Sequence, residues 1–430
     1  MAYHRATSLF RRMRMYSFRL LFLALAFPLA VACAPTKAKM TDNPESPYPP
    51  TRPPVVGDIL HLPSGYYVSE EQMLAVATDA RIVYVGETHD NPASHRLELT
   101  VLRAMADRYP DGVALGMEMF TPDQQPVLDR WSRGELTEKE FIKQSRWHEQ
   151  WRMDFEYYRP LLEFALQRRI PVIGLNAHKR LVNVATQNRL EELSEEDRLL
   201  LPEMNMDDPY HNAFITAIFG GHGHGDGGLD GFRRVQNLWE ESMAESIVRF
   251  LKSPQEENRH MVVVAGGNHV RYGFGIPRRV FRRLPVSYIL IGSKELVIPE
   301  DKRDRLMDVD IPEFPMPPYD FLLFTEYESL ATSGVRLGVL LTEDEGEVRI
   351  KSVLPGSAAE AAGLQGGDVL LTFDGVPLNE SYDLIYEVKQ KNVGDRGILE
   401  IERSGRGQTI EVTFPPPAEG RTPHPLPPKN

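Results

Sequence analysis

The sequence contains a single cysteine, Cys33, which excludes any disulfide bond within the chain. It also lacks a long apolar segment: the longest unbroken run, from Leu20 to Ala32, falls short of the roughly 20 residues that a membrane-spanning helix needs. Basic residues are fewer than acidic ones, 49 against 61, so the formal net charge is −12. An acidic chain does not offer the basic surface that nucleic acids require, and we expect no nucleic-acid partner.

The N-terminal segment has the features of a targeting signal. Five arginines precede the short apolar run, which ends in Leu29-Ala30-Val31-Ala32-Cys33. This order is typical of a secretory signal that is removed on maturation, and we interpret residues 1–32 in this way. Its removal takes away five arginines and no acids, so the net charge becomes −17. An uncleaved anchor that contains Cys33 is the alternative.

The end of this run resembles a bacterial lipobox, although Ala30 stands where the pattern prefers leucine. The resemblance implies that Cys33 is lipidated and attaches the protein to a membrane. Ala34, rather than aspartate, follows the cysteine. By analogy with Gram-negative lipoproteins, this favours the outer membrane, with the protein facing the periplasm or the cell surface.

The composition divides the mature chain into two folded domains joined by irregular segments. Proline-rich and polar stretches without apolar periodicity predict unfolded connections, and the periodic stretches between them predict domains. We therefore expect a disordered tether at 33–57, an α/β domain at 58–295, a proline-rich linker at 296–332, a small β-rich domain at 333–415 and a disordered tail at 416–430.

The α/β domain is predicted from apolar runs that alternate with amphipathic stretches. Continuous apolar strands separated by helices indicate a mostly parallel sheet flanked by helices. The runs are 81–86, 113–119, 171–175, 261–265 and 286–291. The long connection before the fourth run carries helical patterns and predicts a helical subdomain, within which the Gly- and His-rich stretch 220–231 is expected to be a mobile loop.

Polar side chains follow several of the predicted strands, at the point where each strand ends. Glu87 and His89 follow the first run, Glu118 lies in the second, and Asn268 and His269 follow the fourth. Ligands of open parallel sheets bind at the carboxyl ends of the strands, so these residues predict a site at that edge. His95, on the helix after the first strand, is expected to line the same edge.

Two chemistries are open to this set of residues. Glu87, His89, Glu118 and His269 are of the residue types that bind divalent ions such as Mn or Zn. The same carboxylates and imidazoles could instead act as acid and base near neutral pH. Ordinary capping and hydrogen bonding is the structural alternative for each residue taken alone.

At these residues the sequence resembles the ChaN family of haem-binding lipoproteins, within the haem-uptake/Tiki grouping. The resemblance covers about 70–292 and includes Gly86-Glu87-Thr88-His89-Asp90-Asn91, His95, Gly116-Met117-Glu118-Met119 and Gly267-Asn268-His269-Val270. It implies a haem cofactor used in iron uptake, with haem pairs held between the subunits of a homodimer. The cofactor-binding residues would include His89, His95, Asn268 and His269.

The resemblance further implies that a tyrosine binds the haem iron, and two tyrosines are candidates. Tyr158 lies in a Tyr-Arg-Pro motif, and Tyr272 follows Asn268-His269 closely. Phenolate is a suitable ligand for ferric haem in storage or transfer. The sequence does not choose between the two, and packing with a satisfied hydroxyl is the alternative for Tyr158.

The same grouping also contains a different class of protein. Gly86-Glu87-Thr88-His89 and Gly266-Gly267-Asn268-His269 resemble the two Gly-x-x-His motifs of the Tiki metalloproteases. In this alternative a metal held by Glu87, His89, Glu118 and His269 activates water for hydrolysis. We favour the haem carrier, because the overall match and the lipoprotein signal agree with it.

The C-terminal domain resembles a bacterial PDZ domain. Arg336-Leu337-Gly338-Val339 stands where PDZ domains place the loop that binds a carboxylate, and Ala362-Gly363-Leu364 and Phe373-Asp374-Gly375 continue the pattern. The resemblance implies that Leu337, Gly338 and Val339 hold the C-terminus of a peptide or protein partner. A scaffold, in which this binding is the sole function, is a third possible reading of the whole chain.

Overall fold

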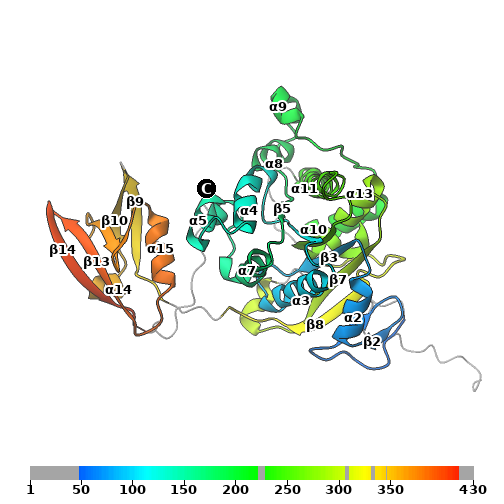
Figure 1. Ribbon diagram of the computed structural model, residues 1–430, viewed down its shortest axis with the longest axis horizontal. Helices are drawn as coiled ribbons and strands as arrows, with labels where there is room; N and C mark the ends of the chain where they lie inside the picture. The colour runs from blue at the N-terminus through cyan, green and yellow to red at the C-terminus, as the bar shows by residue number, and fades with distance from the viewer. Residues whose placement is uncertain (1–47, 221–227, 306–308, 331–334, 345, 416–430) are drawn as a thin grey trace, which may run out of the picture.

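The computed structural model describes residues 48–220, 228–305, 309–330, 335–344 and 346–415. The predicted signal, Cys33 and the predicted C-terminal tail lie outside the described residues. The chain forms a mixed α/β domain with an eight-stranded sheet flanked by helices, followed by a smaller β-rich domain (Figure 1). In the described part of the chain, no helix combines the length and the apolar character that crossing a membrane requires.

The sheet of the first domain has the order β2-β1-β8-β7-β3-β6-β4-β5. The strands from β8 to β5 are parallel to their neighbours, and β1 and β2 add an antiparallel edge. The bounds are β1 Ile59–His61, β2 Tyr66–Val68, β3 Ile82–Glu87, β4 Val113–Met117, β5 Val172–Gly174, β6 His260–Gly266, β7 Tyr288–Val297 and β8 Phe321–Glu326.

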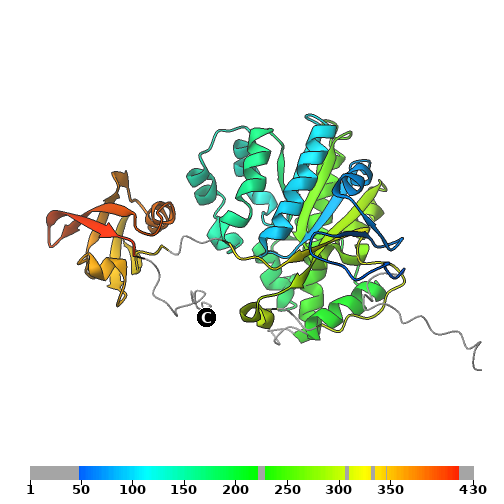
Figure 2. The same cartoon turned by 90° about the horizontal axis from the view of Figure 1, so that it is seen from below.

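Helices cover both faces of this sheet (Figure 2). One face packs against α2 Glu70–Ala77, α3 Pro92–Arg108, α4 Gln125–Ser132, α5 Glu138–Gln144, α6 Trp147–Gln150 and α7 Arg159–Gln167. The other packs against α11 Gly228–Leu251 and α13 Ile276–Arg283. All six residues of β3 are buried, which explains its continuous apolar sequence.

The two central strands, β3 and β6, mark the point where the connections change face. The helix after β3, α3, packs on one face of the sheet, whereas α13, which follows β6, packs on the other. The loops that leave neighbouring strands therefore diverge, and the space between them is the usual ligand site of such folds. Figure 1 shows β3 in the middle of the domain, between helices of both groups.

The predicted helical subdomain is present. Its helices are α8 Lys179–Thr186, α9 Glu195–Arg198 and α10 Pro209–Gly220, together with the N-terminal half of α11. The predicted loop 220–231 is corrected in part, because Gly220 ends α10 and residues 228–231 begin α11. Residues 221–227 lie outside the described residues. Short helical turns complete the domain: α12 Gly267–Val270, η1 Pro122–Gln124, η2 Phe155–Tyr157, η3 Leu190–Glu192, η4 Arg271–Gly273 and η5 Glu300–Arg305.

The predicted linker 296–332 contains a strand of the main sheet, which the sequence did not predict. Strand β7 continues to Val297, and β8 pairs with both β7 and β1 inside the main sheet. The proline content of this segment suggested an irregular chain, but the apolar run Phe321–Phe324 lies buried or partly buried in the sheet. The end of the predicted tether also belongs to the domain, since Gly57 donates a hydrogen bond to the carbonyl of Phe324.

The second domain contains strands in the order β14-β13-β11-β10-β9, with β12 paired to β11. Its own hydrophobic core is separate from those of the first domain. In the described part of the chain, β9 and β14 are the two edges of this sheet. The bounds are β9 Val339–Asp344, β10 Glu347–Val353, β11 Val369–Phe373, β12 Val376–Pro377, β13 Arg396–Arg403, β14 Arg406–Thr413, α14 Ala358–Ala361 and α15 Ser381–Lys389.

Helix α15 of the second domain contacts the first domain near α5 (Figure 1). Lys139 Nζ lies 3.1 Å from Asp383 Oδ1 and 3.0 Å from Glu387 Oε1. Tyr386 donates its hydroxyl to Glu138 at 3.1 Å. The ion pairs of this contact are partly exposed, so we expect them to contribute little to stability.

Candidate functional site

The predicted site residues lie at the carboxyl ends of β3, β4 and β6. Glu87 is the last residue of β3, Glu118 follows β4, and His269 lies in α12, directly after β6. His89 reaches back over the strand ends, because a Cβ on Gly266 would lie 3.0 Å from its Cε1 and Nε2 atoms. The topology therefore brings together residues from three strands, as the sequence predicts.

Glu87 is the centre of a buried group beneath this edge. Its Oε1 atom accepts a hydrogen bond from Tyr158 at 2.9 Å and contacts His89 Nδ1. Its Oε2 atom lies 3.2 Å from Nδ1 of His95, and the same nitrogen lies 3.1 Å from Oε2 of Glu98. We call Glu87, His95 and Glu98 the β3 cluster. In the described part of the chain, these three form the one group of His, Cys, Asp or Glu residues whose candidate ligand atoms all lie within 4.8 Å of one another.

Burial dominates the electrostatics of the β3 cluster. It raises the pKa of Glu98 to about 7. It also raises the pKa of Glu87 to about 7, and the nearby charge of Glu98 adds to that shift. For His89, loss of hydration opposes the charged ring, but the carboxylate of Glu87 outweighs it and raises the pKa of His89 to about 9. Near neutral pH both carboxyls are therefore partly protonated, and His89 carries a positive charge.

The second half of the edge is formed by Glu118 and His269. Glu118 Oε2 accepts the backbone N–H of Gly266 at 2.7 Å, which fixes its carboxylate between β4 and β6. His269 Nε2 lies 3.6 Å from Glu118 Oε1. The amide of Asn176, after β5, donates to the carbonyl of Glu118 at 3.0 Å. Glu118 is thus held by neighbours that belong to or follow β5 and β6.

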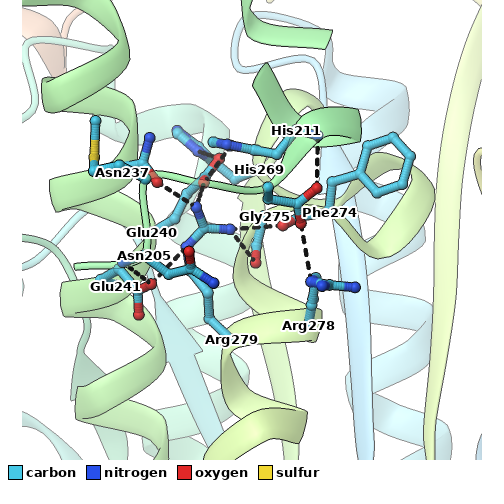
Figure 3. A network of polar contacts seen from close by, with 12 residues as sticks. Asn205, His211, Asn237, Glu240, Glu241, His269, Phe274, Gly275, Arg278 and Arg279 are labelled. Atoms are coloured by element: carbon cyan, nitrogen blue, oxygen red, sulfur yellow. Dashed lines mark hydrogen bonds and ion pairs between the residues drawn. The ribbon is translucent and has the colours of Figure 1, made fainter. Parts of the chain in front are cut away.

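His269 is in turn held by a buried ionic network on α11 (Figure 3). Its Nδ1 atom lies 3.2 Å from Oε1 of Glu240, whose Oε2 atom lies 2.7 Å from His211 Nε2 and 3.2 Å from Arg279. Arg279 also lies 3.3 Å from Glu241. We call Glu240, Glu241, His211 and Arg279 the α11 network; the exposed fraction of each is 4% or less.

Each carboxylate of the α11 network has an arginine partner. Burial alone would raise the pKa of Glu240, but His211 and Arg279 hold the pKa of that carboxyl well below its usual range. Glu241 contacts Arg282 at 3.2 Å and Arg283 at 2.7 Å as well as Arg279. Because Glu240 occupies Nδ1 of His269, the ring presents Nε2 toward Glu118.

A large cleft opens above the strand ends, with a volume of about 1550 Å³. Its lining includes Glu87, His89, Asn268 and His269 on the floor. One wall comes from the segment 309–319, which the sequence assigned to a linker. Apolar groups and three basic residues line the cleft together: Ile218, Leu296, Ile311, Phe314, Met316, Arg271, Lys294 and Arg303.

The two tyrosine candidates occupy different places. Tyr272 lines the cleft and packs against Phe214, Phe274 and Phe314, with ring centroids 4.9–5.7 Å away. Its backbone adopts φ 58°, an uncommon conformation for a non-glycine residue. Tyr158 is fully buried below the floor, and burial raises its pKa well above the usual value. The geometry therefore favours Tyr272 over Tyr158 as a ligand in the cleft.

Several residues of the site were not found by sequence reasoning. Glu98 lies one helical turn after His95 on α3, and this i,i+3 spacing is a signal that could have identified it. Glu240 and His211 come from the helical subdomain, far along the chain from His269. No local pattern indicates that pairing. The predicted His95 lies in the β3 cluster rather than on the cleft lining.

The predicted carboxylate-binding loop of the second domain lies directly before the edge strand β9. Gly338 has φ +82°, and a Cβ there would lie 2.2 Å from Cβ of Ser357, so the position requires glycine. Leu340 on β9 and Ile385 on α15 are 52% and 46% exposed. An open strand edge with exposed apolar groups nearby is the arrangement that strand addition uses.

Comparison with known families agrees with this architecture. Residues 73–280 match the family described as "Haem-binding uptake, Tiki superfamily, ChaN", and residues 335–414 match the PDZ domain family. The first domain is therefore a ChaN-family domain, and the second is a PDZ domain.

Individual relatives match parts of the chain. A 65-residue segment is 42% identical to a probable DegP-like periplasmic serine endoprotease of Marinomonas sp. (strain MWYL1), and another match to the corresponding protein of Pseudomonas putida (strain W619) is 38% identical. Each match covers 15% of this chain and 14% of the relative. The chain thus spans a small part of these curated relatives.

Two solved structures are also similar. One describes cofacial heme binding to ChaN of Campylobacter jejuni, with 15% identity, coverage of 64% of this chain and 97% of that chain, and a TM-score of 0.49. The other is an HtrA-type protease with a decapeptide, with 20% identity, coverage of 20% and 31%, and a TM-score of 0.19.

Proposed function

We propose that this protein binds haem in the cleft above β3 and β6 and takes part in haem or iron uptake. The observation that carries the proposal is the cleft itself: it lies at the switch point of a ChaN-family domain and is about 1550 Å³ in volume. Ligand sites are usually 300–1,000 Å³, so the space is ample for a porphyrin.

The lining of the cleft fits the chemistry of haem. A porphyrin is a flat apolar ring with two carboxylates, and it needs apolar walls with basic groups near their rim. Ile311, Phe314 and Met316 supply apolar surface, and Arg271, Lys294 and Arg303 supply positive charge. Tyr272 is the side chain we propose as the iron ligand, because it lines the cleft and Tyr158 does not. When bound, haem would supply a ferric iron for storage or transfer.

The finer parts of the proposal concern location and partner. We propose that Cys33 is lipidated and anchors the protein to the outer membrane, and that pairs of subunits share the haem. We also propose that the PDZ domain adds a peptide C-terminus to β9, with Leu337, Gly338 and Val339 near the carboxylate. Replacing Gly338 with alanine should cost about 1–3 kcal/mol of local strain and weaken peptide binding.

A haem titration of the full-length chain in detergent, followed by absorbance, tests the main proposal. We expect a saturable shift of the Soret band at stoichiometric haem. Tyr272→Phe should weaken or move this band, and Tyr158→Phe is the matched control that should leave it in place. A spectrum that stays that of free haem throughout the titration contradicts the proposal.

A metal-dependent hydrolase remains the second candidate, supported by the position of Glu87, His89 and His269 on the cleft floor. Glu118, which lies 3.6 Å from His269, completes the set that this function would use. It predicts peptidase activity that requires a divalent metal and is lost in Glu118→Gln. A scaffold would show neither haem binding nor hydrolysis, but would still bind C-terminal peptides.

A further inference from the structure

The β3 cluster is buried, and two of its carboxylate oxygens lack hydrogen-bond partners. Its side chains are almost completely inaccessible to solvent: the exposed fraction of the side chain is 0% for Glu87 and Glu98 and 5% for His95. Glu87 Oε2 and Glu98 Oε1 are buried without a hydrogen-bond donor. Buried carboxylate oxygens without partners are costly, so this arrangement requires an explanation.

The hydrogen bonds of His95 indicate which of its ring nitrogens carries the proton. Its Nε2 atom lies 3.1 Å from the backbone carbonyl of His89, which can only accept, so Nε2 carries the proton. In the neutral ring, Nδ1 then has no proton and presents a lone pair. This lone pair faces Oε2 of Glu87 at 3.2 Å and Oε2 of Glu98 at 3.1 Å, which are acceptors as well. Three acceptors that converge on one point need either a proton or a metal cation between them.

The surrounding residues do not provide that species. In the described part of the chain, neither lysine nor arginine pairs with any member of the β3 cluster. His89 and the hydroxyl of Tyr158 both approach Oε1 of Glu87, on the oxygen that does not face His95. These neighbours therefore orient Glu87 but leave Oε2 available.

We propose that Glu87, His95 and Glu98 bind a divalent first-row transition-metal ion, with Mn²⁺ or Zn²⁺ as the fitting class. Two carboxylates and one imidazole are ligands that such ions accept. The contacts that these ligands make with neighbouring residues also follow the rule for metal sites. A ligating histidine donates its other N–H to a carbonyl, and ligating carboxylates are hydrogen-bonded by neighbours. His95 and Glu87 both have such contacts.

This site is distinct from the haem cleft and from the metal site of the hydrolase considered above. It shares only Glu87 with the metal set of the hydrolase and does not use His89, Glu118 or His269 as ligands. It lies beneath the cleft floor, and neither His95 nor Glu98 lines the cleft. A metal there would lock β3 to α3 and so stiffen the floor on which the cleft rests.

The test is a Mn²⁺ titration of the full-length chain in detergent after treatment with EDTA and dialysis. Free Mn²⁺ is followed by its electron paramagnetic resonance signal, which is lost on binding. We expect one Mn²⁺ per chain, at least about 100-fold weaker binding in Glu98→Gln, and unchanged binding in Glu118→Gln. Zn²⁺ should compete with Mn²⁺ in the wild-type chain.

Three outcomes overturn the proposal. They are a wild-type chain that binds no Mn²⁺, binding that survives in Glu98→Gln, and binding that is lost in Glu118→Gln but not in Glu98→Gln. The last outcome would place the metal in the hydrolase set. Should Glu98→Gln not fold, the wild-type chain alone decides: saturating Mn²⁺ must raise its unfolding temperature, and an unchanged temperature rejects the site. Haem titration of Glu98→Gln keeps the two proposals separate, because the Soret shift should persist.

Discussion

Two buried groups built from the same residue types lie near the strand ends, one beside α3 and the other beside α11, and they differ in how their charge is balanced. The β3 cluster has two glutamates and one histidine, without lysine or arginine. The α11 network also has two glutamates and one histidine, but Arg279 contacts both carboxylates, and Arg282 and Arg283 contact Glu241. In the α11 network both carboxylates have an arginine partner, and in the β3 cluster neither carboxylate has one.

The difference explains why their pKa values move in opposite directions. Desolvation penalises every buried carboxylate, and the outcome depends on the cations nearby. Burial raises the pKa of Glu98 to about 7, and neither lysine nor arginine pairs with this carboxyl to oppose the shift. For Glu240, His211 and Arg279 reverse the effect of burial on the pKa. We infer that the α11 network serves to position His269 and that the β3 cluster serves to bind an ion.

The largest expected effect is the removal of the central cation of the α11 network. Arg279→Met leaves Glu240 and Glu241 buried with fewer cations and should lower the free energy of unfolding by about 3–5 kcal/mol, measured by urea denaturation. Arg278→Met is the matched control. Arg278 is paired with Asp208 at 2.9 Å, but its side chain is 62% exposed, so the loss should stay below about 1 kcal/mol.

Glu98→Gln should act in the opposite direction in the metal-free protein. It removes a buried carboxylate that lacks a cation and should leave stability unchanged or raise it by about 1–3 kcal/mol. The measurement is urea denaturation in EDTA, with the same chain in saturating Mn²⁺ as comparison. If Glu98→Gln costs as much as Arg279→Met, the two groups are alike and the contrast between them is wrong.

The pH dependence of stability should also separate the two groups. Glu87 and Glu98 have folded-state pKa values of about 7, raised from 4.5, so their contribution is present below pH 4.5 and is lost as the pH rises through 7. Glu240 has a lowered pKa, so its contribution is present above pH 4.5 and is lost as the pH falls below that value.

Unfolding temperatures measured from pH 3 to pH 8 in EDTA test this contrast. In Glu98→Gln the decline between pH 4.5 and 7 should be reduced, while the acid limb should remain. A decline that is identical in the variant and the wild-type chain would show that the β3 cluster does not titrate in this range.

The smallest effect concerns the hydroxyl that orients Glu87. Tyr158→Phe removes a buried hydrogen bond of 2.9 Å and should cost about 1 kcal/mol of stability. Because this hydroxyl binds Oε1 of Glu87 and so orients Oε2 toward the metal site, Mn²⁺ should bind about 10-fold more weakly to the variant. Metal titration of the purified variant is the measurement, and unchanged affinity would mean that Tyr158 is a packing residue only.

Local patterns predicted much of the fold. Helix α3 occupies one of the amphipathic stretches between the predicted strands, and its start is set by the side chain of Asn91 and by Pro92 at the first turn. The buried strands before Glu87 and Glu118 were predicted from continuous apolar runs, and that placed both carboxylates at one edge. Strand β8 was missed because five prolines within 296–318 concealed the short apolar run that follows.

The candidate site was predicted less completely. Residues near the strand ends, such as His89 and His269, follow from sequence position, because the ends of parallel strands share an edge. Glu240 and His211 did not follow, since α10 and α11 belong to a subdomain whose packing on the sheet is not encoded in any local spacing. For Glu98 the i,i+3 spacing to His95 was visible, but its burial was not.

The sequence alone determined the succession of strands and helices, the two-domain order and the residue types at the strand ends, because these depend on local apolar periodicity and on turn residues. The tertiary structure decided which of those side chains meet. It placed Tyr158 below the floor and Tyr272 in the cleft, turned the proline-rich segment 309–319 into a wall, and gave arginines to one Glu–His group but not the other. Such pairings depend on contacts between distant segments, and burial then sets their charge.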